Sequence, residues 1–345
     1  MSGSKTPIEA NLRIACFIKL GKILSTLPPD TVSMLCRKAK FENAWFNELS
    51  VTCALQSLAE MLSDDSLTDF VSGYPGIFNL KAPKNIGVVM AGNIPAVGFH
   101  DALCVLLSGN ILQAKLSKSD TCLMDFLLNQ IQEIEPSFKG YIHVCERMSG
   151  MDAVICTGSD NSARYFESYF GKYPHVIRKN RTSLALLDGN ESADDLNKLG
   201  KDIFTYFGLG CRNVSKVYIP HEYDITKLID TFEPYSWVIN EHKYANNYTY
   251  NRAIFLMNLD IFLDNNFLLI KESENLHSPI SVLFYERYTD VDRVIKYVET
   301  ESSKIQCVVS KSPIVKGWVP FGRTQSPGIT DFADGVDTLK FILEL

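Results

Sequence analysis

Residues 86–116, IGVVMAGNIPAVGFHDALCVLLSGNILQAKL, decide the fold of this chain. The run Ile86–Ala91 predicts a buried strand, Ala96–Leu107 predicts a helix, and Ile111–Leu116 predicts a second buried strand. A strand, a helix and a strand in this order place the two strands parallel, because the helix carries the chain back along one face of the sheet.

The alternation of strands and helices continues on both sides of this stretch. Residues 8–63 have the periodicity of helices, and Pro28-Pro29 separates two of them. After residue 116 the pattern predicts helices over 121–134 and 162–170, and strands over 141–145, 153–156, 175–178 and 184–187. Strands that alternate with helices form a parallel sheet covered on both faces, and ligands bind beyond the carboxyl ends of its strands. We therefore predict a Rossmann-type cofactor domain of the α/β class.

A second, smaller α/β domain is expected after a helix near Leu196–Phe207. Its predicted strands cover residues 214–219, 280–285 and 305–309, and its predicted helices cover 225–232 and 291–298. We expect a helical N-terminal segment and cofactor domain in residues 1–206, a catalytic domain in 207–312, and a C-terminal return in 313–345. The apolar tail Leu339–Leu343 is expected to be an edge strand or a strand between subunits.

The composition argues against several classes of protein. The 345 residues include 34 Lys and Arg against 40 Asp and Glu, a net charge of −6, which disfavours a dedicated nucleic-acid binder. No window reaches the roughly 18 uninterrupted apolar residues of a membrane span, and the charged start lacks the apolar run of a signal peptide. The nine cysteines are scattered and odd in number, which favours a reducing, cytoplasmic compartment and no metal site.

Two polar turns follow the first two predicted strands. In the first turn, Asn93 either points its amide into the ligand crevice or caps the following helix. In the second, Lys115, Ser117 and Lys118 either receive the ribose and phosphates of a nucleotide or form a solvated loop.

A third turn, Thr157-Gly158-Ser159, lies between a predicted strand and a helix. Its small hydroxyl residues, its glycine and the helix amides after it suit a phosphate. The fingerprint G-x-G-x-x-G is absent at any suitable place, and so are the HExxH, Walker and GxSxG patterns. His100, beside Asp101, is either an acid–base group or a hydrogen-bonded core histidine.

Cys211 is the cysteine that its surroundings single out. It lies in the segment GLGCRN between a predicted helix and a predicted strand, and the two glycines leave it accessible. The neighbouring Arg212 favours the thiolate, which is the nucleophilic form. Cys104 and Cys156 lie inside apolar runs and are expected to be buried and structural.

The order of these stretches resembles the aldehyde dehydrogenase superfamily. GNIP, KLSKSD, TGSD and GLGCRN stand here in the order of that superfamily's WNFP-like turn, KPSE-like loop, FTGS turn and catalytic-cysteine segment. The chain is more closely similar to acyl-CoA reductases of the LuxC type. The stretches that carry this similarity, within roughly residues 80 to 345, are VVMAGNIPAVGFHDALCVLLSGN, VIRKNRTSLALLDGNES, FGLGCRNVSKVYIP and VPFGRTQSPGITDFADGVDTLKFI.

The resemblance implies a role for each matching residue. Cys211 takes the place of the nucleophile, and Asn93 matches the asparagine that forms the oxyanion hole with the nucleophile's own backbone N–H. The cofactor contacts that the resemblance implies are Lys115 and Ser117 on the adenosine side and Thr157, Gly158 and Ser159 beside the phosphates.

Three positions depart from the superfamily pattern. Leu186 stands at the expected place of the glutamate base of hydrolytic aldehyde dehydrogenases, which leaves Glu191 and His100 as weak candidates for proton transfer. Lys118 replaces the glutamate of KPSE, and because a lysine suits a 2′-phosphate, we expect NADPH, with NADH as the alternative. Asn275 stands where a glutamate would contact the nicotinamide ribose.

The activity implied by the resemblance is the NADPH-dependent reduction of an acyl-CoA, expected to be a fatty acyl-CoA, to the aldehyde. The missing base favours reduction over hydrolysis, because hydride and not water attacks the acyl-enzyme. The alternatives are a CoA-acylating or hydrolytic aldehyde dehydrogenase and a non-redox acyl-transfer subunit. The family further implies a homo-oligomer and an acyl-transferring or acyl-activating partner protein.

Overall fold

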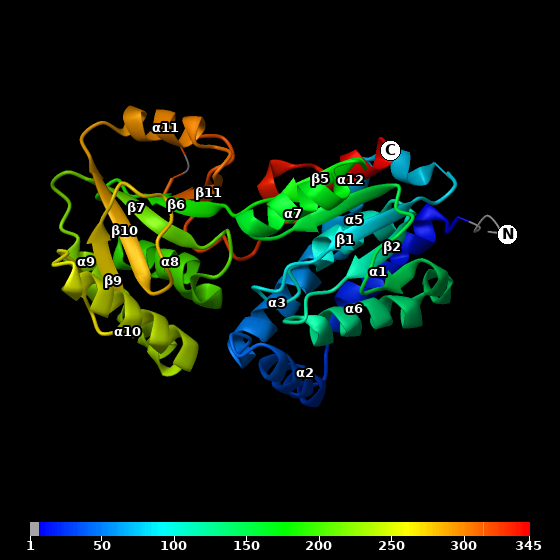
Figure 1. Cartoon of the computed structure of the whole chain (residues 1–345), viewed down its shortest axis with the longest axis horizontal. Helices are drawn as coiled ribbons and strands as arrows, with labels where there is room; N and C mark the ends of the chain where they lie inside the picture. The colour runs from blue at the N-terminus through cyan, green and yellow to red at the C-terminus, as the bar shows by residue number, and fades with distance from the viewer. Residues whose placement is uncertain (1–6, 80, 313) are drawn as a thin grey trace. The chain divides into compact units, whose positions relative to one another are not determined.

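The computed structural model describes residues 7–79, 81–312 and 314–345, and its contacts divide the chain into two compact units (Figure 1). Unit 1 combines Met1–Asn180 with Pro327–Leu345, and unit 2 consists of Arg181–Ser326. The chain therefore leaves unit 1 some 26 residues before the expected boundary at 206, and it returns at Pro327. Each unit is described below by itself.

Unit 1 begins with helices whose starts follow from local chemistry. Pro29 occupies the first turn of its helix, where its missing N–H costs no hydrogen bond. Asn47 and Ser63 cap the next two helices by accepting the N–H groups of Ser50 and Ser66. These helices are α1 (Ala10–Ser25), α2 (Pro29–Glu42), α3 (Glu48–Met61) and α4 (Asp64–Ser72), followed by the short η1 (Pro75–Phe78).

A five-stranded parallel sheet forms the centre of unit 1, with the order β3-β2-β1-β4-β5. Its strands are β1 (Asn85–Val89), β2 (Ile111–Lys115), β3 (Ile142–Val144), β4 (Ala153–Thr157) and β5 (His175–Arg178). The connecting elements are α5 (Phe99–Leu107), α6 (Thr121–Ile134), η2 (Pro136–Gly140) and α7 (Asp160–Phe170). The predicted parallel α/β sheet is confirmed.

Alternate residues of these strands enter two different apolar clusters, one on each face. Ile86 and Ile155 pack in the large cluster with α1, α5 and α6, whereas Val154 and Cys156 pack with Phe166 of α7. Successive side chains of a strand point to opposite faces, so this division shows that helices cover both sides of the sheet.

The return of the chain to unit 1 ends in a helix and not in the expected strand. Helix α12 (Thr338–Leu343) follows η5 (Ala333–Gly335), and Asp337 caps it by accepting the N–H of Lys340 at 2.9 Å. Leu339 and Ile342, three residues apart, are both buried in the cluster that contains α5. The apolar run 339–343 alone does not separate a short buried helix from a strand, and the Asp337 cap decides for the helix.

A buried ion pair connects the edge of the sheet to α5 and α12. The Arg178 guanidinium donates to both carboxylate oxygens of Asp101, at 2.6 and 2.9 Å, and to the hydroxyl of Thr338 at 2.7 Å. Burial alone would lower the pKa of Arg178, but the Asp101 carboxylate outweighs it and raises that pKa. The pair thus joins three segments that are far apart in the sequence.

Unit 2 is built on a seven-stranded sheet with the order β12-β11-β6-β7-β10-β9-β8, in which β8 alone runs antiparallel to its neighbour. Its strands are β6 (Thr182–Leu186), β7 (Val214–Pro220), β8 (Leu263–Asp264), β9 (Leu269–Glu272), β10 (Val282–Tyr288), β11 (Ile305–Ser310) and β12 (Val319–Pro320). Its helical elements are α8 (Ala193–Phe204), η3 (Thr205–Gly208), α9 (Thr226–Thr231), η4 (Glu233–Asn240), α10 (His242–Met257) and α11 (Val291–Thr300).

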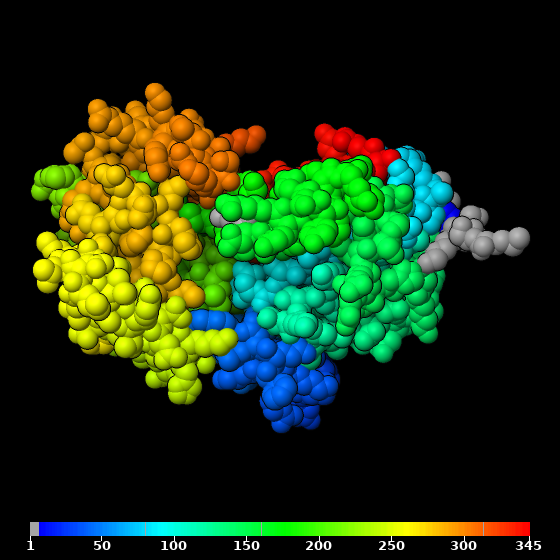
Figure 2. All heavy atoms as spheres, in the orientation of Figure 1, coloured from blue at the N-terminus to red at the C-terminus, as the bar shows by residue number. Residues whose placement is uncertain are grey.

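Helix α10 has no counterpart among the predicted elements. Its buried residues are Tyr244, Asn251 and Phe255, so a polar residue interrupts the buried face and weakens the apolar period. In the space-filling view the segment around α10 (yellow) forms part of the surface of unit 2 (Figure 2). None of the helices in the described part of the chain combines the length and the apolar character needed to cross a membrane.

Candidate active site

The three polar turns of unit 1 leave the sheet at the same edge. One follows β1, the second follows β2 and the third ends β4, and β2 and β4 pair with β1 on either side. Because all three strands are parallel, their carboxyl ends meet at this edge. The chain goes from β1 to β2 on one side and later to β4 on the other, which makes this edge the switch point where α/β sheets bind ligands.

The turn that carries Asn93 is packed against the loop after β2. A Cβ added to Gly92 would lie 2.4 Å from the Ser117 Oγ and 2.6 Å from the Ser117 Cβ, so only glycine fits there. On the other side, the Asn43 side chain donates to the Gly92 carbonyl at 3.2 Å. The exposed Asn93 therefore lies in a turn that contacts from α2 and from the second loop hold in place.

Asn93 is not the cap of the helix that follows. Helix α5 begins at Phe99 and Gly98 is its N-cap, three residues later than the sequence predicts. The reason is Ala96, whose φ of 55° is left-handed and cannot belong to an α-helix. Of the two interpretations of Asn93, the structure excludes the one in which Asn93 caps this helix.

The loop after β2 is a tight turn with two exposed lysines. The Ser117 carbonyl accepts the N–H of Asp120 at 3.0 Å and the hydroxyl of Thr121 at 3.1 Å, and this turn leads directly into α6. Lys115 and Lys118 are both exposed. The loop thus offers two positive charges at the carboxyl edge of the sheet.

The turn after β4 makes contacts within the fold, and one of its residues is exposed. The Thr157 hydroxyl accepts from Arg178 at 3.3 Å, and the Ser159 hydroxyl caps α7 by accepting the N–H of Ser162 at 3.3 Å. A Cβ on Gly158 would lie 2.8 Å from the Ser162 Cβ, so this glycine is needed for packing. The exposed Ser159 stands at the N-terminus of α7, where the helix dipole favours an anion.

In unit 2, Cys211 follows a strained segment. The sequence predicts one helix up to Phe207, but α8 ends at Phe204, and Tyr206, Phe207 and Gly208 have φ values of 54°, 58° and 80°. A left-handed residue other than glycine costs about 1–2 kcal/mol. Burial of the aromatic rings offsets this cost, and the Phe207 ring lies 5.7 Å from that of Trp237.

Two buried side chains that the sequence did not single out fix the backbone around Cys211. Asn213 donates through its amide to the carbonyl of Thr205 at 2.6 Å, and its oxygen accepts the N–H of Gly210 at 2.9 Å. The Ser183 hydroxyl, on β6, donates to the carbonyl of Cys211 at 2.9 Å and contacts the sulfur of Cys307 at 3.0 Å. Cys211 itself is half-buried. Asn213 directly precedes the buried strand β7, and a polar residue at such a place is the signal that could have identified it.

Asp202 secures the same region from α8. Its buried carboxylate accepts the N–H groups of Gly322 at 2.6 Å and Thr324 at 3.0 Å, and the hydroxyl of Thr324 at 2.8 Å. Burial raises the pKa of Asp202, and these hydrogen bonds offset part of the rise. The end of α8, just before the thiol segment, is thereby attached to the chain near residue 323.

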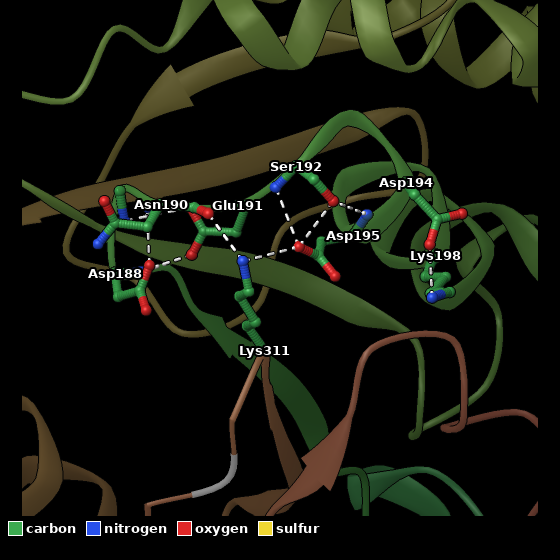
Figure 3. Close-up of polar contacts among 9 residues, drawn as sticks. Asp188, Asn190, Glu191, Ser192, Asp194, Asp195, Lys198 and Lys311 are labelled. Atoms are coloured by element: carbon green, nitrogen blue, oxygen red, sulfur yellow. Dashed lines mark hydrogen bonds and ion pairs between the residues drawn. The ribbon is translucent and has the colours of Figure 1, made fainter.

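The strand β6 and the turn after it contain Leu186, at the expected place of a base, and Glu191. Leu186 is buried in the apolar core of unit 2. Glu191 accepts the N–H groups of Asp188 at 2.6 Å and Gly189 at 3.1 Å, and burial raises its pKa. Figure 3 shows Lys311 beside this turn, where it donates to the Asn190 carbonyl at 2.8 Å. Glu191 therefore shapes the turn.

The same connection ends in a helix cap. Ser192 and Asp195 form a capping box at the start of α8, and the Lys311 ammonium lies 3.1 Å from the Asp195 carboxylate (Figure 3). Hydrogen bonds from Ser192 lower the pKa of Asp195 to about 2.

His100 contacts the returning segment of unit 1, and the thiols of Cys104 and Cys156 are buried in the core. The His100 Nε2 lies 2.8 Å from the Ile329 carbonyl, and its ring packs edge-on against Phe332. Cys104 and Cys156 are fully buried, as expected from their apolar runs, and burial raises the pKa of both thiols, that of Cys156 to about 12. No three His, Cys, Asp or Glu side chains of the described residues form a group that could hold a metal ion.

Comparison with solved structures identifies the fold. Aldehyde dehydrogenase 21 from Physcomitrella patens, in complex with succinate, has a TM-score of 0.65 at 12% identity over 88% of this chain and 73% of its own. A mutant of aldehyde dehydrogenase C from Pseudomonas syringae, with NAD+ and octanal, has a TM-score of 0.66 at 8% identity over 89% and 73%. The propionaldehyde dehydrogenase of a Clostridium phytofermentans microcompartment has a TM-score of 0.60 at 11% identity over 91% and 88%.

These likenesses confirm the predicted aldehyde-dehydrogenase-like α/β fold. A search of curated proteins finds no match. The family model for acyl-CoA reductase (LuxC) matches residues 36–228, which is more than half of the 345 residues. The chain therefore belongs to the LuxC acyl-CoA reductase family.

Proposed function

We propose that this protein reduces an acyl-CoA, of the fatty acyl class, to the aldehyde through a thioester on Cys211. Membership of the LuxC acyl-CoA reductase family, together with the aldehyde dehydrogenase fold, supports an oxidoreductase of acyl-CoA and aldehyde chemistry. The observation that carries the proposal is the family match, because it spans Asn93, the two lysines of the second loop and Cys211.

The residues at the carboxyl edge of the unit 1 sheet suit a nicotinamide cofactor. Solved neighbours of the fold were determined in complex with NAD+. Here the packing of Gly92 against Ser117 and of Gly158 against Ser162 holds both turns close to their neighbours at this edge. We assign the adenosine side to Lys115 and Ser117, the phosphates to Thr157, Gly158 and Ser159, and a 2′-phosphate to Lys118, which favours NADPH.

The chemistry divides between the thiol and the amide. The Cys211 thiolate attacks the thioester carbon of the acyl-CoA, and the carbonyl oxygen becomes an oxyanion, which the Asn93 amide and the Cys211 N–H stabilise. CoA leaves as its thiolate, and the acyl group remains on the sulfur. NADPH, held by the residues assigned above, would supply the hydride to the acyl carbon. The resulting thiohemiacetal then releases the aldehyde and regenerates the Cys211 thiolate.

The test of the proposal follows NADPH absorbance with a panel of acyl-CoAs of increasing chain length. Reduction predicts one NADPH oxidised and one CoA thiol released for each aldehyde formed. Hydrolysis would release free acid without NADPH oxidation, and a CoA-acylating dehydrogenase working in the opposite direction would need aldehyde, CoA and NADP+. A non-redox acyl-transfer subunit, the family's implied alternative, would become acylated without consuming reduced nicotinamide.

Asn93→Ala is expected to lower kcat by about 100- to 1,000-fold, because removing one oxyanion donor costs roughly 3–4 kcal/mol. The KM for the acyl-CoA should change little, since the lost interaction forms mainly in the transition state. Asn129→Ala, at an exposed site of α6, is the matched control and should keep the parent rate. An Asn93→Ala protein as fast as the parent would remove Asn93 from the oxyanion hole.

Lys118→Glu is expected to shift the ratio of kcat/KM for NADPH over NADH by about 10- to 100-fold toward NADH. A hydrogen bond to a charged group contributes about 1.5–3 kcal/mol, and the glutamate both removes it and repels the 2′-phosphate. Lys139→Glu makes the same charge change at an exposed site in η2 and should leave the ratio unchanged. Equal shifts in the two variants would mean that Lys118 acts only through net charge.

A further inference from the structure

The loop after β2 contains a buried acid that the proposed reaction does not use. Asp120 is only 1% exposed and lies between the Ser117 turn and α6. One carboxylate oxygen, Oδ2, accepts the N–H of Ala96 at 2.8 Å. The other oxygen, Oδ1, is also buried and accepts no hydrogen bond from the residues that the structure describes. Buried polar atoms in folded proteins nearly always have a hydrogen-bond partner, so the unpaired Oδ1 requires an explanation.

Asp120 contacts both ends of the turn that carries Asn93. At the far end it holds the amide of Ala96, a left-handed alanine that is 4% exposed. At the near end, a Cβ on Gly92 would lie 3.4 Å from the Cβ of Asp120, so the Asp120 side chain lies beside Gly92. Left-handed conformations of residues other than glycine persist where their surroundings impose them. Here the hydrogen bond from Ala96 is the polar contact that does so.

We propose that Asp120 is a positioning residue for the reduction, which fixes the place of the Asn93 amide by holding the turn from Gly92 to Ala96. This inference rests on the proposed function, since it assigns Asp120 a role through the oxyanion donor. An oxyanion donor is effective only when it is held in place before the reaction, and a shift of about 1 Å can cost on the order of 100-fold in rate.

The buried and charged surroundings of Asp120 act on the pKa of its carboxyl group. Burial raises the pKa of Asp120 to about 8, the Ala96 N–H lowers it in part, and the carboxylate of Glu42 raises it further. Glu42 itself accepts the N–H of Cys122 at 2.9 Å. On α6, Asp125 also lies near Glu42, and Lys38 of α2 acts on Cys122; the turn 92–96 carries no titratable side chain.

The experiment measures kcat with NADPH and octanoyl-CoA at pH 7 in the parent protein and in three variants. Asp120→Ala loses the bond to Ala96 and should lower kcat at pH 7 by about 10- to 100-fold, with the KM for NADPH within twofold. Asp120→Asn keeps an oxygen for the Ala96 N–H, so its kcat should stay within about threefold of the parent. Asp125→Asn, the matched control on the same helix, should keep the parent kcat.

A double-mutant cycle tests whether Asp120 acts through Asn93. In an Asn93→Ala background, Asp120→Ala should lower kcat by less than about threefold, because the donor that it positions is gone. The inference is overturned if Asp120→Ala is as costly in that background as in the parent, or if Asp120→Asn is as slow as Asp120→Ala.

Hydrogen exchange separates this inference from the proposed function. In the cofactor-free proteins, the Ala96 amide should exchange at least tenfold faster in Asp120→Ala than in the parent, whatever the enzyme catalyses. Equal protection of that amide would overturn the role of Asp120. Faster exchange in a protein that oxidises no NADPH with any acyl-CoA would overturn the reaction, and with it the catalytic role of Asp120, while leaving its hold on the turn established.

Discussion

Cys211→Ala is expected to abolish acyl-CoA reduction, lowering kcat by roughly 10⁴- to 10⁶-fold, the range found when a covalent nucleophile is removed. Without the sulfur no acyl-enzyme forms, and no other side chain replaces a covalent intermediate. The loop should keep its shape, because Asn213 and Ser183 hold it through the backbone carbonyls and amides around Cys211. The rate of NADPH oxidation with octanoyl-CoA measures the loss of kcat in Cys211→Ala.

Mass spectrometry tests the role of Cys211 a second time, by detecting the acyl group on the protein. Incubation with octanoyl-CoA in the absence of NADPH should add one octanoyl group to the parent at Cys211 and none to Cys211→Ala. Cys53→Ser, which changes another half-buried thiol in α3, should be acylated and active like the parent. Should Cys211→Ala retain a tenth of the parent activity, the nucleophile would have to be another group.

Arg178→Ala is expected to destabilise unit 1 by about 3–5 kcal/mol, the cost of leaving one charge of a buried pair without its partner. The side chains of Arg178 and Asp101 are only 4% and 8% exposed, so water cannot replace the lost contact. The loss also removes the hydrogen bond to Thr338, which attaches α12. Urea unfolding followed by circular dichroism measures the change in the free energy of unfolding.

Two further variants test whether the unpaired buried charge causes the loss of stability in Arg178→Ala. Arg147→Ala removes an exposed arginine and should change the free energy of unfolding by less than about 0.5 kcal/mol. The double variant Arg178→Met with Asp101→Leu should be less destabilised than Arg178→Ala, because no unpaired charge remains. A loss below 1 kcal/mol for Arg178→Ala would contradict this account of the pair.

Local patterns predict the elements of unit 1 closely. The helix over 121–134 and the strand over 175–178 agree with the structure to the residue, because each is a clear apolar pattern with polar or glycine-containing ends. Where the pattern fails, the cause is a backbone conformation or a contact. Ala96 and Tyr206 adopt left-handed torsions that no composition signals, and they move the start of α5 and the end of α8.

Local sequence patterns do not predict the division into units or the residues that hold the site, because both depend on contacts between residues far apart in the sequence. Strand β6 joins β7 and β11 in the sheet of unit 2, although its apolar run is like those of unit 1. The turns that carry Asn93 and Cys211 are recognisable from their glycines and their place after strands and helices. The groups that hold them, Asp120 and Asn213, bond to residues 24 and 8 positions away, and such bonds appear only in the folded chain.

The discontinuous make-up of unit 1 sets an order of events during synthesis. The whole of unit 2 is synthesised before α12, so the first 180 residues wait with the site for Leu339 and Ile342 uncovered. Domains fold as units during translation, and exposed apolar surface invites aggregation. The apolar surface that Leu339 and Ile342 cover therefore stays exposed until α12 emerges, and a ribosome that stalls within unit 2 would leave that surface as a substrate for chaperones.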